Sequence, residues 1–214
     1  MLKIPNPNFK WQPYLHAISQ TFKQYGIHPE VVDKSKVHNT VKKMFLKDTS
    51  IGKLINLSFI HHPNKKFTIK FEIDTNPPHG SNEDIKFLEF PLDFSILVQD
   101  LHSNFAGKCH ALLCRTYIKG RDWYDFIWYV AKKITPNLTF LTNALDQQGP
   151  WTKQKINVTP SWLYEVMREK INHVDFEKAK KDVEPFLNTQ DKKALVLWGS
   201  DFFLDKLNRL DLNQ

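Results

Sequence analysis

Apolar and polar positions recur with clear helical or strand periods along the chain. From Phe9 to Tyr25 the apolar residues have helical spacing and Gly26 is a natural stop, so this segment is expected to be a helix. Short runs rich in β-branched and aromatic residues follow, with turn signals between them, and they predict a mostly antiparallel group of strands. These runs are Val31–Val32, Val41–Leu46, Leu54–Ile60, Phe67–Asp74 and Ile85–Val98.

The run Phe67–Asp74 (FTIKFEID) alternates cleanly between apolar and polar residues. Its period of two places Lys70, Glu72 and Asp74 on one face of a strand. An ordinary sheet with one solvated face has this pattern. The same pattern also suits two carboxylates that share a divalent metal while Lys70 holds a phosphate.

Helical periodicity dominates from Asp100 onward. Two adjacent helices are expected at Asp100–Arg115 and Arg121–Ile134, and later helices have recognisable starts or caps. These later helices are Asn137–Asp146, one opened by Thr159–Pro160, one capped by Asp175, and Trp198–Leu210. The pattern predicts an α+β protein, with a mixed, largely antiparallel sheet domain over residues 1–99 and a C-terminal helical bundle over residues 100–214.

The segment Asn104–Val130 places a lysine (Lys108), two arginines and two aspartates among the most apolar and aromatic residues of the chain. Lys108 lies at the edge of the apolar stripe of its helix, where it either extends its ammonium into water or binds a phosphate. Asp122 falls in the first turn of the next helix, where it or Asp125 could cap backbone N–H groups instead of serving chemistry. The two arginines of the segment are Arg115 and Arg121.

Charge and cysteine content narrow the environment of the protein. The formal net charge is +7, and residues 1–60 carry nine lysines against three acidic residues. This favours a polyanionic partner, although a solvated lysine-rich face would look the same. Cys109 and Cys114 lie about 140° apart around one helix, so they should not pair, which fits a reducing compartment. The absence of an apolar run of signal-peptide or membrane-span length predicts a cytoplasmic protein with no membrane partner.

Several segments together resemble one family. They are FAGKCHALLCR (Phe105–Arg115), KGRDWYD (Lys119–Asp125), IKFEID (Ile69–Asp74) running into Asn76–Pro78, QQGPW (Gln147–Trp151) and DVEPF (Asp182–Phe186). The chain resembles the AbiEii/AbiGii family of nucleotidyltransferase-like toxins over nearly its whole length.

Asp182 is the one polar residue of the tail that stands out, and we expect it to serve a helix end.

The resemblance implies a DNA polymerase β-type nucleotidyltransferase of a type IV toxin–antitoxin or abortive-infection (phage-defence) system. Such an enzyme transfers a nucleoside monophosphate from an NTP to an acceptor such as tRNA, uses Mg²⁺ or Mn²⁺, and has a cognate antitoxin as partner. By resemblance the catalytic residues are Glu72, Lys108 and Asp122; the nucleotide-binding residues are Lys70, Lys108, Arg115 and Arg121; and the metal ligands are Glu72 and Asp74.

One part of the family pattern does not match. Family members begin with a segment of roughly 80 to 100 residues that carries Gly-Ser and then Asp-x-Asp, the first metal ligands. The pairs Gly80-Ser81 and Gly199-Ser200 are not followed by such a strand. We therefore expect a truncated enzyme that is weakly active or inactive alone. The alternative is a non-catalytic remnant that binds nucleic acid, the antitoxin or a separately encoded N-terminal fragment.

Overall fold

The computed structural model describes residues 5–36, 39–48, 67–89 and 93–210. The chain forms two compact units, Met1–Pro77 and Pro78–Gln214, each of which is described by itself. Both units contain strands or sheets and the second is rich in helices, so the predicted α+β class is confirmed. The predicted division into domains at residue 99 stays a prediction.

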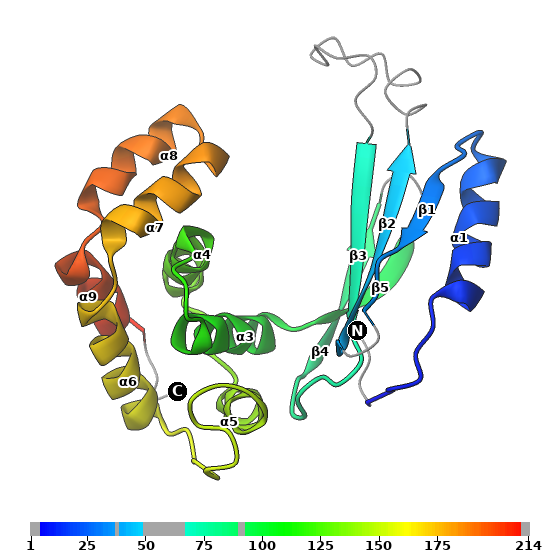
Figure 1. Ribbon diagram of the computed structural model, residues 1–214. Coiled ribbons are helices and arrows are strands. Elements are labelled where there is room, and N and C mark those ends of the chain that lie inside the picture. Colours follow the sequence, from blue (N-terminus) through cyan, green and yellow to red (C-terminus); the bar gives the residue numbers. More distant parts are fainter. Residues whose placement is uncertain (1–4, 37–38, 49–66, 90–92, 211–214) are drawn as a thin grey trace. The chain divides into compact units, whose positions relative to one another are not determined.

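The first unit is a three-stranded antiparallel sheet with one helix alongside it (Figure 1). The helix α1 spans Gln12–Gln24, and the strands in spatial order are β1 (Glu30–Asp33), β2 (Val41–Asp48) and β3 (Phe67–Asp74). The predicted strand Leu54–Ile60 lies outside the described residues. The predicted helix and the strands at β1, β2 and β3 are confirmed.

A small core joins α1 to this sheet. Its buried residues are Phe9, Trp11, Met44 and Leu46, and the apolar faces of α1 and β3 pack against them. Because alternate side chains of a strand face opposite sides, β3 turns Ile69 and Ile73 toward this core and its polar residues away from it. The alternation of β3 therefore reflects one packed face and one exposed face.

The second unit begins with a hairpin. The predicted run Ile85–Val98 is two strands, β4 (Glu83–Leu88) and β5 (Phe94–Gln99), which pair antiparallel as a sheet of their own. The described strands thus form two antiparallel sheets, where the apolar runs alone suggested a single group.

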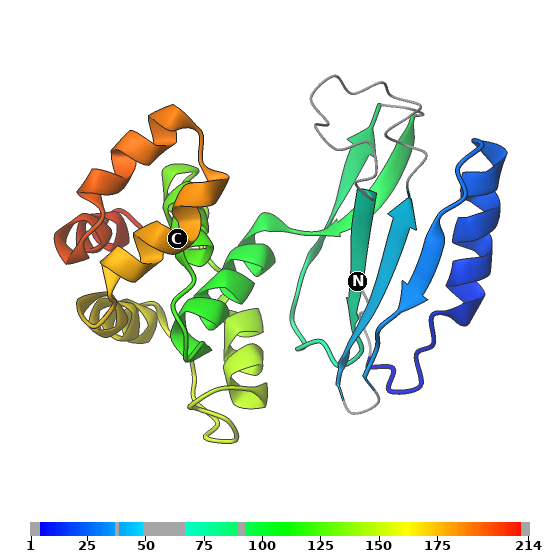
Figure 2. The same ribbon diagram turned by 45° about the horizontal axis from the view of Figure 1, so that its top comes forward.

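Helices make up the rest of the second unit. In Figure 2, α3 and α4 lie side by side and α7 lies next to α4. Their shared core is aromatic: the Phe105 ring stacks on Tyr129 at 4.5 Å, and Trp123 packs edge-on against Phe203 at 5.1 Å. The helices are α3 (Leu101–Cys114), α4 (Gly120–Ala131), α5 (Leu138–Gln147), α6 (Pro160–Asn172), α7 (Phe176–Val183), α8 (Thr189–Ala194) and α9 (Ser200–Asn208), with 3₁₀ turns η1 (Glu184–Phe186) and η2 (Leu195–Leu197).

The helix starts follow the local capping rules. Asp100, Asn137, Thr159 and Asp175 each accept a hydrogen bond from the backbone N–H three residues later. The predicted starts of α3, α5, α6 and α7 are therefore confirmed. Within the described ranges, no helix combines the length and the apolar character that a membrane crossing requires.

Candidate functional site

Two adjacent helices bring four charged side chains together. Lys108 lies on α3 and Arg115 is the C-cap residue that follows this helix seven residues later, while Asp122 and Asp125 lie one turn apart on α4. Lys108 Nζ is 3.2 Å from Asp122 Oδ1 and 2.6 Å from Asp125 Oδ2. On the other side of Asp122, Arg115 Nη1 is 2.7 Å from Oδ2. We call these four residues the Lys108 cluster.

Burial differs sharply within the Lys108 cluster. Asp122 is 1% exposed, whereas about a third of the Lys108 and Arg115 side chains remains exposed. A buried carboxylate is costly unless it is paired, and Asp122 has a hydrogen bond from Lys108 at Oδ1 and, at Oδ2, an ion pair with Arg115 whose geometry is not that of a hydrogen bond. Burial acts to lower the pKa of Lys108, but the hydrogen bond and charge of Asp125, followed by the charge of Asp122, outweigh it and raise this pKa above its ordinary value.

Asp122 does not cap its own helix. The N-cap position of α4 is Lys119, which makes no side-chain capping bond, and the backbone N–H of Gly120 donates instead to Asp182 Oδ2 at 2.9 Å. The capping alternative for Asp122 and Asp125 is therefore wrong, because both carboxylates are used by Lys108. The expected helix-end role of Asp182 is confirmed, although the helix that it caps is α4 and not its own.

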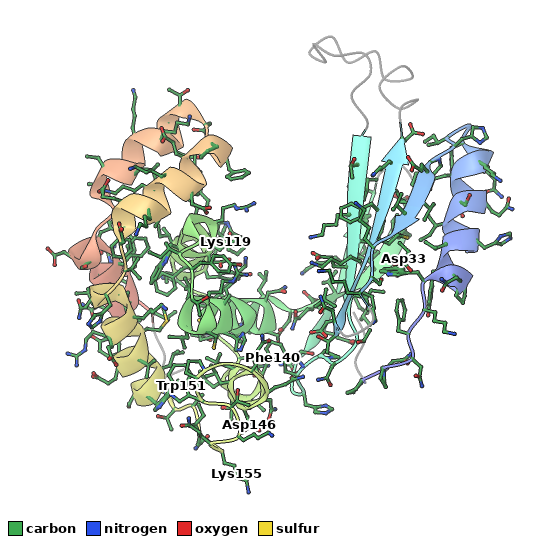
Figure 3. The ribbon with its side chains drawn as sticks, in the orientation of Figure 1. Asp33, Lys119, Phe140, Asp146, Trp151 and Lys155 are labelled. Atoms are coloured by element: carbon green, nitrogen blue, oxygen red, sulfur yellow. The ribbon has the colours of Figure 1, made fainter. Side chains whose placement is uncertain are left out.

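A pocket of about 240 Å³ adjoins the Lys108 cluster beyond the end of α3. Arg115 and Asp122 belong to both the cluster and the pocket wall. Lys119, which lies beside α4 in Figure 3, also lines the pocket. We call it the Arg115 pocket; its lining residues are Ala111, Leu112, Arg115, Thr116, Tyr117, Ile118, Lys119, Asp122, Trp123, Lys170, His173 and Val174.

Sequence reasoning found the cluster but missed part of the pocket. Lys119 lies in the KGRD segment that carried the family resemblance, so a signal for it was present. Lys170 and His173 come from the C-terminal end of α6. Basic residues are common at that end of any helix because they interact favourably with its dipole, so their presence gave no signal of a binding site. Arg121 lies elsewhere: its guanidinium is 4.3 Å over the ring of Phe186.

The polar residues of β3 lie in the first unit. Glu72 Oε1 is 2.8 Å from Lys70 Nζ and 3.3 Å from Lys43 Nζ, which faces it from β2. The hydrogen bond from Lys70 is the main cause that lowers the pKa of Glu72; burial opposes it and Lys43 adds to it. Asp74 accepts a hydrogen bond from the backbone N–H of Asn76 at 2.9 Å, in the turn that ends the strand.

These two carboxylates do not fit a metal centre as they stand. Two ammonium groups already neutralise Glu72, and Asp74 is engaged with the backbone. Among the described residues, no group of three or more His, Cys, Asp or Glu side chains could hold a metal ion. The predicted roles of Glu72 and Asp74 as metal ligands therefore stay predictions.

Comparison with known proteins identifies a family for this chain. A family model described as "Nucleotidyl transferase AbiEii toxin, Type IV TA system" matches residues 5–206. No curated protein and no solved structure matches the chain. The family match spans both units, so it includes β3 and the Lys108 cluster.

Proposed function

Because the chain belongs to the AbiEii family of nucleotidyl transferase toxins of type IV toxin–antitoxin systems, we propose that it transfers a nucleoside monophosphate from an NTP to an acceptor such as tRNA. The family implies an NTP substrate and an antitoxin partner. Within this function, the Lys108 cluster is the part of the chain that binds the NTP phosphates. The observation that carries this proposal is the buried Asp122, held between Lys108 and Arg115 in a chain of this family.

Lys108 is suited to a phosphate in spite of its two carboxylate partners. An ammonium group has three N–H donors, and Asp122 and Asp125 use two of them. The side chain is 35% exposed, so the third donor can reach a phosphate oxygen from the solvent side. The raised pKa of Lys108 keeps the ammonium charged throughout the neutral range.

Asp122 holds the two cations in place. Its two oxygens contact one cation each, so Lys108 and Arg115 are separated and oriented before any ligand arrives. Such preorganisation removes part of the entropic cost of binding. The predicted nucleotide-binding roles of Lys70, in the first unit, and of the exposed Arg121, in the second, are kept as separate proposals.

Nucleotide binding tests this function most directly. We expect the purified chain to bind NTP and to label tRNA weakly from an α-phosphate-labelled NTP. Lys108→Ala should weaken NTP binding about tenfold, because it removes a charge-assisted hydrogen bond. The matched control is Lys132→Ala. Lys132 is an exposed lysine at the C-terminal end of α4, whereas Asp122 lies in the first turn of that helix. Equal NTP affinities of the Lys108→Ala variant and the wild-type chain would contradict the proposal.

A second candidate function is nucleic-acid binding without catalysis. The observation that favours it is the lysine content of β2, which carries Lys42, Lys43 and Lys47 in eight residues. A cation–π contact also holds Lys34 5.8 Å over the ring of Phe45 on the same strand. RNA binding in the absence of NTP, with an affinity that falls steeply as salt rises, would support this function. RNA binding that does not change with salt would contradict it.

A further inference from the structure

We propose that the Arg115 pocket binds one 5′-phosphorylated nucleoside, as a free mononucleotide or as the terminal nucleotide of a strand. This site is separate from the contact assigned to Lys108, which is not among the residues that line the pocket. The proposal depends on the composition and the geometry of the pocket, and it would hold even if the chain transferred no nucleotide.

The charge of the pocket wall favours a dianion. Arg115, Lys119 and Lys170 supply three basic side chains. Among the described residues of the wall, Asp122 supplies the one carboxylate, and its charge is already compensated by Arg115 and, from outside the pocket, by Lys108. A phosphate monoester carries nearly two negative charges at neutral pH, so it matches the excess of positive charge.

His173 adds a directional contact. Its Nδ1 is 2.8 Å from the backbone carbonyl oxygen of Glu169. A carbonyl oxygen can only accept, so Nδ1 carries the hydrogen of this bond and Nε2 is the nitrogen left for a ligand. The ring orientation is thereby fixed from within α6, on the wall that also contains Lys170.

The rest of the wall suits a flat, partly apolar group. Leu112, Ile118, Val174 and Trp123 supply apolar surface, and the ring of Tyr117 lies 5.5 Å from the guanidinium of Arg115. Cationic groups beside apolar and aromatic side chains are the usual surroundings of a nucleotide, because the bases stack while the phosphate is paired. Pockets for drug-sized ligands measure about 300 to 1,000 Å³, so a pocket of about 240 Å³ can enclose one nucleotide at most, with part of it left outside.

Asp122 links this pocket to the Lys108 cluster. Its Oδ2 is paired with Arg115 on the pocket side and its Oδ1 with Lys108 on the cluster side. A phosphate that binds Arg115 competes with Asp122 for the guanidinium, which leaves more of the carboxylate charge to Lys108. Binding in the pocket and NTP binding at Lys108 are therefore expected to be coupled.

The test uses AMP, adenosine and inorganic phosphate as probes in isothermal titration of the full chain. We expect AMP to bind more tightly than either adenosine or phosphate, because it makes both kinds of contact. Lys119→Ala and Lys170→Ala should each weaken AMP binding about tenfold. The Lys132→Ala control should leave it unchanged, and thermal melting checks that every variant is folded.

Two further comparisons separate the possible outcomes. Lys108→Ala should weaken NTP binding more than AMP binding, and Lys119→Ala should do the reverse; a loss of AMP binding in Lys108→Ala with AMP binding retained in Lys119→Ala and Lys170→Ala would assign AMP to the Lys108 cluster and overturn the proposal. A short oligoribonucleotide with a 5′-phosphate is compared with the same strand bearing a 5′-hydroxyl. Tighter binding of the phosphorylated strand than of AMP identifies a strand end as the ligand, and the reverse order identifies a free mononucleotide. The absence of saturable binding of both would overturn the proposal.

Discussion

Asp182 accepts a hydrogen bond from the backbone N–H of Gly120 at 2.9 Å, although 62 residues separate them along the chain. The contact fastens the beginning of α4 to α7. At the same place the two backbones approach so closely that a Cβ atom on Gly120 would lie 1.9 Å from the carbonyl oxygen of Ala179. Asp122 comes two residues later, so its position between Lys108 and Arg115 depends on this junction.

The first prediction concerns the glycine at this junction. Gly120→Ala should lower the free energy of unfolding by about 3 kcal/mol or more, because backbone atoms must move to admit the methyl group. The matched control is Gly107→Ala in α3, where the nearest atom would lie 4.0 Å away. That variant should gain about 0.5–1 kcal/mol from helix propensity. Urea denaturation measures both, and a neutral Gly120→Ala would contradict the close approach.

The second prediction concerns the cap itself. Asp182→Ala should cost about 1 kcal/mol in urea denaturation, because the N–H of Gly120 loses its acceptor. Asp205→Ala serves as the control. Asp205 makes an exposed ion pair with Arg209 on α9, and its removal should cost less than about 0.5 kcal/mol. Equal costs for the two variants would show that the cap contributes nothing beyond surface charge.

The parts of the fold that could be predicted are those set by neighbours in sequence. Caps such as Asp100 and Thr159 bond to the N–H group three residues later, so the sequence identifies the helix starts directly. The bond from Gly120 to Asp182 has no such local signal, because its geometry arises only when α7 packs on α4. The sequence therefore indicated that Asp182 serves a helix end, but it did not indicate that this end is the start of α4.

The residues of the candidate site could likewise be predicted only where they are close in sequence. Lys108 and Arg115 are seven residues apart, which places them on one side of a helix, and in the structure both contact Asp122. Lys170 and His173 reach the Arg115 pocket from α6, which is more than 50 residues away along the chain. No periodicity or motif connects residues across that separation, so the pocket could be found only from coordinates.

The third prediction compares the two aspartates of the Lys108 cluster. Asp122→Asn should lower stability by about 2 kcal/mol, because it removes a buried charge that serves two cations. The Asp125 side chain is 39% exposed, so Asp125→Asn should lower the free energy of unfolding by less than about 1 kcal/mol. Circular dichroism should show native helix content for both variants, since neither residue caps α4. Unfolding of the Asp122→Asn variant would mean that the charge is needed for folding and not only for the site.

The fourth prediction is a pH dependence. The pKa of Lys108 is raised in the folded protein, so its contribution to stability is complete below the ordinary lysine value of 10.5. The contribution is lost as pH rises through the higher pKa of the folded state. The stability difference between the wild-type chain and the Lys108→Met variant should therefore be constant from pH 7 to about 9 and shrink above about 10.5. A constant difference for Lys108 across the alkaline range would contradict the ion pairs.

The fifth prediction uses Cys114 as a reporter of the Arg115 pocket. Burial raises the pKa of this thiol to about 11, and the charge of Lys170 opposes the shift. At pH 8 only about one thousandth of the thiol is then thiolate, so a thiol reagent should react slowly, and faster as pH approaches 11. Cys109 is fully buried with a raised pKa and should react only after unfolding.

Lys170→Ala sharpens this measurement, because it removes a charge that lowers the pKa of Cys114. Labelling of Cys114 in this variant should be slower than in the wild-type chain and should require a higher pH. The Lys132→Ala variant, whose lysine lies at the far end of α4, should label at the wild-type rate. If Lys170→Ala left the rate unchanged, its ammonium would not lie near the end of α3, and the cationic wall of the pocket would lose one of its members.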